Sequence, residues 1–416
     1  MLQKTIALYK NAYGGLSREI WLLSFISLVN RAGSMVFPFM TIYLTQSLNY
    51  SLKEAGFIMA FFGLGSIAGS YLGGWLTDRV GNYKVQFWSL IATAFVLLFI
   101  LKVKTFWGFS FMAFLLSLAA DSFRPANKVA VSFYAKPENI TRSYALLRLA
   151  INMGFAIGPA LGGILAAWKG YDWLFYADAL TCLLAAMFFK FSLKDEFIPT
   201  KQENGATKMP AITESAKSPI KDHFYLIFLV FISLLSFAFL QLFYTVPVFL
   251  KQEVALNEGQ IGMFMALNGI IIVVFEMPLV YLAEKMLSPF KAMAIGSALV
   301  GIGFLCFAIP SSWIGVIGLV MILLTFGEIF WMPFASSWVA QRSTDANRGQ
   351  YMAFYSMAWA TASVITPTIG FQISEIWGFN SLWVLLFIIC SLGSIGFLIM
   401  KRKSIALIPK LQNQET

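Results

Sequence analysis

Charged residues are scarce in this sequence. They make up 12% of its 416 residues, whereas soluble globular domains carry about 25%. Hydrophobic residues make up 59%, and the mean hydropathy is +0.74. Such a chain has too little charge to cover a water-exposed surface, which argues against a soluble protein. We expect an integral membrane protein in contact with the lipid bilayer.

Cysteine and histidine are nearly absent. Cys182, Cys306 and Cys390 lie singly in apolar stretches, and His223 is the single histidine. Isolated cysteines in odd number provide no disulfide framework, and nothing here has the spacing of metal ligands. We therefore expect no metal site and no cofactor, and nothing in this set indicates an enzyme.

The alternating pattern of membrane β-barrel strands is also absent. Segments such as FYLIFLVFISLLSFAFLQLF (224–243) are continuously apolar, and a transmembrane helix needs about 20 such residues. This predicts an all-α integral membrane fold with twelve transmembrane helices. The predicted spans cover residues 19–46, 55–77, 84–102, 106–134, 143–167, 173–193, 223–250, 259–283, 291–309, 314–340, 350–374 and 381–400.

Lysine and arginine are distributed unevenly between the predicted connections. With a cytoplasmic N-terminus, the outward connections hold only Lys53, Lys102, Lys104, Lys169 and Lys251. By the positive-inside rule this predicts a multi-pass protein of the plasma membrane with both termini cytoplasmic. The net charge of +10 is then a matter of topology and does not indicate nucleic acid as a partner.

A polar stretch divides the sequence into two similar halves. Residues 42–60 match residues 248–266 at an offset of 206, the difference between 248 and 42. Two parallel repeats predict two pseudo-symmetric six-helix bundles, with a substrate site near the membrane midplane between them and transport by alternating access. The predicted division is an N-terminal bundle over 1–193, a mobile cytoplasmic linker over 194–222, a C-terminal bundle over 223–403 and a cytoplasmic tail over 404–416.

The connection between the second and third spans, GGWLTDRVGNYK (73–84), carries a known signature. It resembles the motif of the major facilitator superfamily, which implies a conformational latch on the cytoplasmic face. Glycine permits close helix approach and tight turns, and an acid can interact with a helix N-terminus. The residues that match are Gly74, Leu76, Asp78, Arg79, Gly81 and Lys84.

Two further stretches resemble different subfamilies. GFAIGPALGG (154–163) is similar to a helix-packing motif of the drug:proton antiporters, with Gly154, Gly158, Pro159, Gly162 and Gly163 in place. This implies export, although small residues also serve ordinary helix packing. Arg124-Pro125 and GEIFWMPFASSW (327–338) resemble the proton-coupled oligopeptide transporters, but the first span lacks their Glu-x-x-Glu-Arg proton site.

Few ionisable residues lie inside the predicted spans, and such residues mark ion or substrate pathways. Glu328 ranks first as the proton-coupling residue because no base lies within four residues of it. Asp121 ranks second: it is separated from Glu328 by 207 residues, close to the repeat offset, and has Arg124 three residues away. Glu276 ranks third. The remaining members of the set are Arg31, Arg148 and Asp178.

The substrate-binding residues are expected among the basic, amide and aromatic side chains of the same spans. Arg31 suits either an anionic substrate group or pairing with Asp121, and Lys128 is expected to reach the cytoplasmic interface. The predicted set is Arg31, Arg124, Asn30, Tyr43, Phe243, Tyr244 and Trp331.

These features predict a monomeric, proton-coupled secondary active transporter of a small molecule. The favoured activity is export of small amphipathic or cationic compounds by drug:proton antiport. The alternative is a proton-coupled symporter that takes up peptide-like or other polar metabolites. The sequence does not exclude sodium as the coupling ion. A third functional class is a scaffold or receptor that transports nothing.

Overall fold

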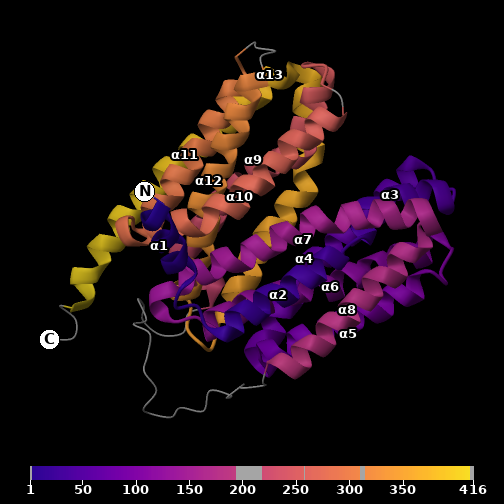
Figure 1. Cartoon of the computed structure of the whole chain (residues 1–416), viewed down its shortest axis with the longest axis horizontal. Helices are drawn as coiled ribbons and strands as arrows, with labels where there is room; N and C mark the ends of the chain where they lie inside the picture. Colours follow the sequence, from indigo (N-terminus) through magenta and orange to yellow (C-terminus); the bar gives the residue numbers. More distant parts are fainter. Residues whose placement is uncertain (1, 194–217, 257, 310–313, 413–416) are drawn as a thin grey trace. The chain divides into compact units, whose positions relative to one another are not determined.

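The computed structural model describes residues 2–193, 218–256, 258–309 and 314–412, and over these residues the fold is all-α (Figure 1). Most of the predicted linker, residues 194–217, lies outside the described residues. The first half forms α1 (Leu2–Tyr13), α2 (Arg18–Gly33), α3 (Val36–Ile42), α4 (Leu52–Val80), α5 (Asn82–Ile100), α6 (Phe106–Tyr134), α7 (Ile140–Lys169) and α8 (Asp172–Ser192). The second half forms α9 (His223–Gln252), α10 (Glu258–Met286), α11 (Pro289–Phe307), α12 (Ile314–Arg342) and α13 (Arg348–Gln412).

Eleven helical stretches of the described chain are long and apolar enough to cross a membrane. The last covers Arg348–Arg402, more than twice the length of one span. Gly378 interrupts its helical geometry with φ of 79°, so this stretch holds two spans. The prediction of an all-α fold with twelve transmembrane helices is confirmed, and the predicted span over 106–134 coincides with α6.

The first span is discontinuous. Helix α2 ends at Gly33, α3 starts at Val36, and a π-helical turn over Tyr43–Ser47 completes the span. A side chain at Gly33 would overlap Thr181 of α8, so glycine is required for the close packing at this break. The sequence-based span over 19–46 does not reveal the interruption, because hydropathy is insensitive to local backbone breaks.

The described residues form two compact units. The N-terminal unit combines Gly15–Asp222 with Val339–Thr361, and the C-terminal unit combines Met1–Gly14, His223–Trp338 and Ala362–Thr416. This grouping differs from the predicted division at residues 1–14 and 339–361, and it also assigns the described linker residues 218–222 to the N-terminal unit. The difference arises because the sequence-based division followed chain order, whereas these two segments pack on helices that are distant in sequence.

Within the N-terminal unit, α4 and α6 pack backbone to backbone. A Cβ atom added at any of three glycines of α4 would overlap the backbone of α6, and the glycines are spaced four residues apart, on one face of the helix. We call this contact the glycine seam. It consists of Gly65, Gly69 and Gly73, which face Phe114, Leu118 and Ser122 respectively.

Within the C-terminal unit, the short helix α1 packs against α10. The Tyr9 hydroxyl donates a 2.7 Å hydrogen bond to the carbonyl of Val274. In a regular helix that carbonyl would accept from residue 278, but Pro278 has no N–H. Tyr9 therefore satisfies the carbonyl that the proline leaves free. Helix α1 was not predicted from the sequence, because twelve residues are too few to span a membrane.

Candidate functional site

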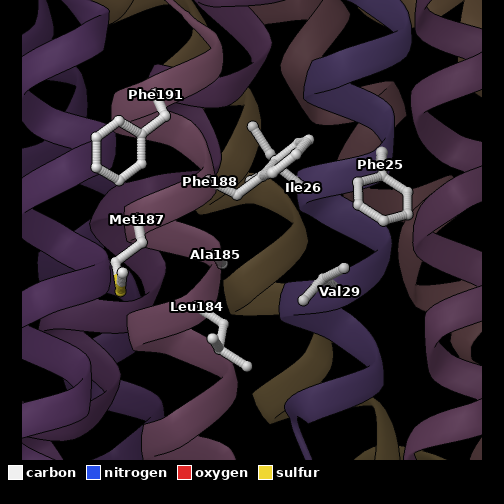
Figure 2. Close-up of a pocket in the computed structure, with 8 residues that line it drawn as sticks. All are labelled: Phe25, Ile26, Val29, Leu184, Ala185, Met187, Phe188 and Phe191. Carbon is white, nitrogen blue, oxygen red and sulfur yellow. The ribbon is translucent and has the colours of Figure 1, made fainter.

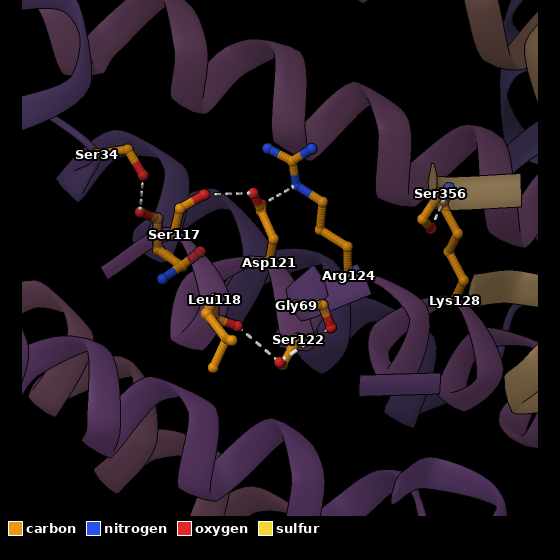
Figure 3. Close-up of polar contacts among 10 residues, drawn as sticks. Ser34, Gly69, Ser117, Leu118, Asp121, Ser122, Arg124, Lys128 and Ser356 are labelled. Carbon is orange, nitrogen blue, oxygen red and sulfur yellow. Dashed lines mark hydrogen bonds and ion pairs between the residues drawn. The ribbon is translucent and has the colours of Figure 1, made fainter. Parts of the chain in front are cut away.

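The N-terminal unit carries Asp121 in the middle of α6. Asp121 is only 4% exposed. Its carboxylate lies 2.7 Å from Nε of Arg124 and accepts a 3.2 Å hydrogen bond from the Ser117 hydroxyl (Figure 3). A spacing of three residues places both charged groups on one face of the helix. The ion pair that this spacing allows is therefore present, and Arg124 is the immediate counter-ion of Asp121.

Arg31 of α2 extends the charged cluster. Its guanidinium lies 5.0 Å from the centre of the Phe155 ring and interacts electrostatically with Arg124, Asp121 and Asp178. Asn30, the neighbouring predicted substrate residue, contacts the sulfur of Cys182 at 3.7 Å. The cluster thus combines two bases and two acids from three helices of one unit.

Asp178 of α8 stabilises the break in the first span. It is 7% exposed and accepts hydrogen bonds from the backbone N–H groups of Met35 and Val36. These N–H groups lie at the start of α3, where no preceding helical turn supplies acceptors. Asp178 therefore acts as the cap of α3.

Lys128 is half-buried and contacts α13. Its amine lies 4.2 Å from the centre of the Tyr355 ring and 3.4 Å from the Ser356 hydroxyl (Figure 3). Its expected place at the cytoplasmic interface stays a prediction. Helix α6 continues for six residues beyond it, to Tyr134, and the 339–361 segment of the same unit packs over its side chain.

The glycine-rich face of α7 packs against the broken first span. A Cβ added at Gly158 would lie 3.1 Å from the carbonyl oxygen of Arg31, and one at Gly162 would lie 3.0 Å from the Phe39 ring. Gly154 likewise faces Cβ of Arg31 and the backbone of Leu28 and Ala32, while Gly163 lies beside Phe39. Pro159 sits inside α7 between these contacts. The motif therefore fixes the backbone position of Arg31.

The signature at the end of α4 binds the first turn of α13. The Asp78 carboxylate accepts hydrogen bonds from the backbone N–H groups of Gly349, at 2.6 Å, and Gln350, at 2.8 Å. An acid at a helix N-terminus is favoured by the free N–H groups and the helix dipole. Gly74 allows the two backbones to meet, because a Cβ there would overlap Gly349 and Ala353.

The other members of the signature shape the end of α4. The Arg79 guanidinium lies 3.9 Å from the centre of the Trp75 ring. Gly81 has φ of 91°, a conformation that favours glycine, and separates α4 from α5. Lys84 lies in the first turn of α5.

A second polar network, formed by Asp222, Arg342 and Tyr351, was not predicted from the sequence. Asp222 is 7% exposed, and both of its carboxylate oxygens face Arg342, at 3.0 and 3.1 Å. The Tyr351 hydroxyl donates a further 2.9 Å hydrogen bond to Asp222. No local pattern in the sequence indicates this network, because Asp222 is more than 100 residues from both Arg342 and Tyr351.

The C-terminal unit carries Glu328 in the middle of α12. Glu328 is 3% exposed, and the side-chain amide of Asn268 donates a 3.2 Å hydrogen bond to it. The same amide donates to the Thr325 hydroxyl at 2.9 Å. Counted from the start of their helices, Glu328 is residue 15 of α12 and Asp121 is residue 16 of α6, and both helices have 29 residues.

Glu276 of α10 is fully buried, two residues before Pro278. Tyr13 of α1 lies close enough for its hydroxyl to interact with the Glu276 carboxylate. Burial raises the pKa of the Tyr13 phenol, and the charge of Glu276 and the nearby Tyr9 raise it further. The third predicted acid is thus covered by α1.

The remaining predicted substrate residues occupy different environments. Tyr43 is 4% exposed and packs in an apolar cluster, 4.8 Å from the centre of the Phe175 ring. Trp331 is fully buried and lies against Gly296 of α11. Phe243 is 51% exposed and stacks edgewise on Phe239, and Tyr244 is half-buried. Their part in substrate binding stays a prediction.

Sequence reasoning missed a buried neutral cluster in the C-terminal unit. Gln241 and Thr245 of α9 are both fully buried and hydrogen-bonded to each other, and Gln241 donates to the carbonyl of Thr366 at 3.4 Å. Gly370 makes room for Gln241. The available signal was a single glutamine in an otherwise apolar span.

A groove between α2 and α8 is entirely apolar and contains none of the predicted site residues (Figure 2). It is lined by Phe25, Ile26 and Val29 from α2 and by Leu184, Ala185, Met187, Phe188 and Phe191 from α8. Phe191 is 80% exposed. Such a surface suits contact with lipid chains and offers no group for binding a charged substrate.

Known proteins resemble this chain over most of its length. An uncharacterised MFS-type transporter of Bacillus subtilis, YqjV, is 26% identical over 343 residues, which cover 82% of this chain and 82% of that protein. A Na(+), Li(+), K(+)/H(+) antiporter of Planococcus maritimus is 24% identical over 86% of this chain and 89% of its own. The crystal structure of the human organic anion transporter MFSD10 superposes with a TM-score of 0.73 at 15% identity, covering 92% of this chain and 100% of that chain.

The family assignment follows from a match to the whole chain. The sequence profile of the Major Facilitator Superfamily matches residues 20–333 and, in a second match, residues 226–413. Together these cover both halves and agree with the fold. The chain therefore belongs to the major facilitator superfamily, and it is a multi-pass membrane transporter of small molecules and not an enzyme.

Proposed function

We propose that this transporter is a proton-coupled antiporter that exports small amphipathic compounds by alternating access. Glu328 is its main proton carrier, and Asp121 and Glu276 are secondary sites. The observation that carries the proposal is the environment of Glu328, which is 3% exposed and hydrogen-bonded by the neutral amide of Asn268. A desolvated carboxyl with a neutral partner can exist in both protonation states, as a proton carrier must.

The antiport direction is supported by the family relationships. The Planococcus relative is named as a cation/proton antiporter, and the glycine face of α7 packs as the antiporter motif implies. We place the protein in the plasma membrane as a monomer, with both termini cytoplasmic. In this proposal the contact of Asp78 with the first turn of α13 is the latch that opens and closes during transport.

The test is transport in proteoliposomes that contain a pH-sensitive dye. A fluorescent amphipathic compound is added outside without a pH gradient. Antiport moves protons outward, so the internal pH should rise as the compound enters. An internal pH that falls would instead establish symport, the runner-up suggested by Arg124-Pro125. A sodium flux without any pH change would overturn proton coupling.

Glu328→Gln is expected to keep exchange of the compound across the membrane while the coupled pH change falls at least tenfold. Glu375→Gln is the matched control, because Glu375 is an exposed acid of α13. It should leave both readouts at the wild-type level. Full proton coupling in Glu328→Gln would remove Glu328 as the carrier.

A further inference from the structure

Two cations lie on one face of α6, four residues apart: Arg124 and Lys128. Arg124 uses only Nε in its ion pair with Asp121. Among the described residues, its two terminal nitrogens make no hydrogen bond, and in Figure 3 the dashed line to Asp121 starts at Nε. The forked end of this guanidinium is therefore available to a ligand.

Lys128 also lacks a carboxylate. Its amine faces the Tyr355 ring and the Ser356 hydroxyl, and within the described part of the chain no acid contacts it. A ring face and one hydroxyl only partly replace the water that an ammonium group loses inside a membrane span. An anion placed beside Lys128 would complete its solvation.

The surrounding charges leave a positive excess. The cations of the cluster are Arg31, Arg124 and Lys128, and the acids are Asp121 and Asp178. Asp121 is engaged by Arg124 and Ser117, and Asp178 is engaged by the N-terminus of α3. Neither acid contacts Lys128. The excess positive charge of this cluster therefore favours binding of an anionic ligand.

We propose that Arg124, Lys128 and Ser356 bind a carboxylate of the transported compound, so that the substrate is an organic anion or zwitterion. This rests on the proposed transport function and defines its substrate class. A guanidinium fork binds a carboxylate through two parallel hydrogen bonds, and an ammonium adds a point charge. The Ser356 hydroxyl can accept from Lys128 and donate its proton to the ligand.

The aromatic neighbour defines the rest of the ligand. Tyr355 is 2% exposed and its ring lies directly beside the Lys128 amine. Because α6 is an apolar membrane-spanning helix, a carboxylate with an apolar body would enter this region more readily than a strongly hydrated inorganic anion. The inferred substrate is thus an aromatic or aliphatic carboxylate. The sequence-based expectation was an amphipathic or cationic compound.

The experiment compares three probes with the same apolar body: 2-naphthoate, 2-naphthylmethylammonium and 2-naphthalenemethanol. Equilibrium binding to the purified full chain in neutral detergent is measured by calorimetry, with no ion gradient. The wild type should bind the carboxylate at least tenfold more tightly than the other two probes. Equal or tighter binding of the ammonium probe would overturn the inference.

Variants locate the site. Arg124→Gln and Lys128→Gln should each weaken naphthoate binding at least tenfold, while Lys128→Arg should retain most of it. Lys102→Gln is the matched control, because Lys102 is an exposed lysine outside the spans. Wild-type affinity in Lys128→Gln would disprove the assignment. If Lys128→Arg retains naphthoate binding, the weaker binding of Lys128→Gln cannot be attributed to misfolding caused by any substitution at this position.

Two further arms separate the remaining explanations. Phosphatidylglycerol is added to test whether a lipid headgroup is the natural occupant, and displacement of naphthoate by this lipid would overturn the substrate assignment. Naphthoate binding to Glu328→Gln should equal the wild type. If the protein binds naphthoate but shows no proton coupling, the proposed function is wrong and this inference stands. If it transports the ammonium probe with proton coupling but does not transport naphthoate, this inference is wrong and the proposed function stands.

Discussion

At the scale of single residues, the charged groups of this transporter differ in what compensates them. Asp121 has an arginine 2.7 Å away, whereas Glu328 has an amide at 3.2 Å. The first contact is an ion pair, and the second is a hydrogen bond from a neutral group. Two acids at nearly equivalent helix positions are therefore suited to different tasks.

Asp121→Asn is expected to destabilise the N-terminal unit, because it leaves the Arg124 charge uncompensated in the span. The loss should be about 1–3 kcal/mol, since the arginine side chain is 37% exposed and partly screened. Thermal unfolding in detergent measures it.

The double variant Asp121→Asn with Arg124→Gln should recover most of that loss, because no unpaired charge remains. Ser117→Ala is the control, since it removes the weaker partner of Asp121 and leaves the ion pair in place. Additive losses in the double variant would show that the pair contributes nothing to stability.

At the scale of elements, the glycine seam packs α4 and α6 into one rigid helix pair. The seam allows contact between backbones along two turns of each helix, and such close contact is a main source of helix association in membranes. A Cβ atom at any of its positions would have to push the two helices apart.

Gly69→Ala and Gly73→Ala should each lower the free energy of unfolding by about 1–3 kcal/mol, because the added methyl group overpacks the seam. Gly56→Ala, in the same helix, is the matched control, since nothing lies within 4 Å of a Cβ there. Thermal unfolding of the three variants provides the comparison. Equal stability of all three would refute the role of the seam.

The elements themselves were largely predictable from the sequence. Hydropathy located the spans because the bilayer requires long apolar helices, and α6 was placed at its observed ends. Two elements escaped this approach: α1, which is too short to span, and the break after Gly33. Both depend on contacts with distant residues, Val274 for α1 and Asp178 for the break.

The candidate site was only partly predictable, for the same reason. Asp121, Glu276 and Glu328 stand out in the sequence because charge inside an apolar span is rare. The partner of Lys128 could not be foreseen, since Tyr355 is 227 positions later in the chain, the difference between 355 and 128. Gln241 was overlooked because it carries no charge.

At the scale of the whole molecule, the segment 339–361 is the notable departure from chain order. It belongs to the second half of the sequence but packs within the N-terminal unit. Asp78 and Asp222 both hold it there, through backbone N–H groups at Gly349 and Gln350 and through Arg342. These polar contacts act together with the buried side chains of the segment, among them Met352, Ala353 and Tyr355.

Asp78→Ala should loosen the first turn of α13. Hydrogen exchange at the Gly349 and Gln350 amides is expected to accelerate about tenfold, which corresponds to about 1.4 kcal/mol, the usual scale of a lost helix cap. Asp345→Asn is the control, because Asp345 is 81% exposed and pairs with Arg348 near the same helix end. Unchanged exchange in Asp78→Ala would show that the latch contact does not hold the segment.

The glycine seam also connects two places that do not touch. Asp121 and Arg124 lie on α6, and Asp78 lies near the end of α4, beyond the last seam glycine. Because the two backbones are in direct contact along the seam, α4 and α6 cannot shift independently. A change of charge or ligand at α6 would therefore be felt at Asp78 as displacement of a single rigid part, without any chain of hydrogen bonds running between them.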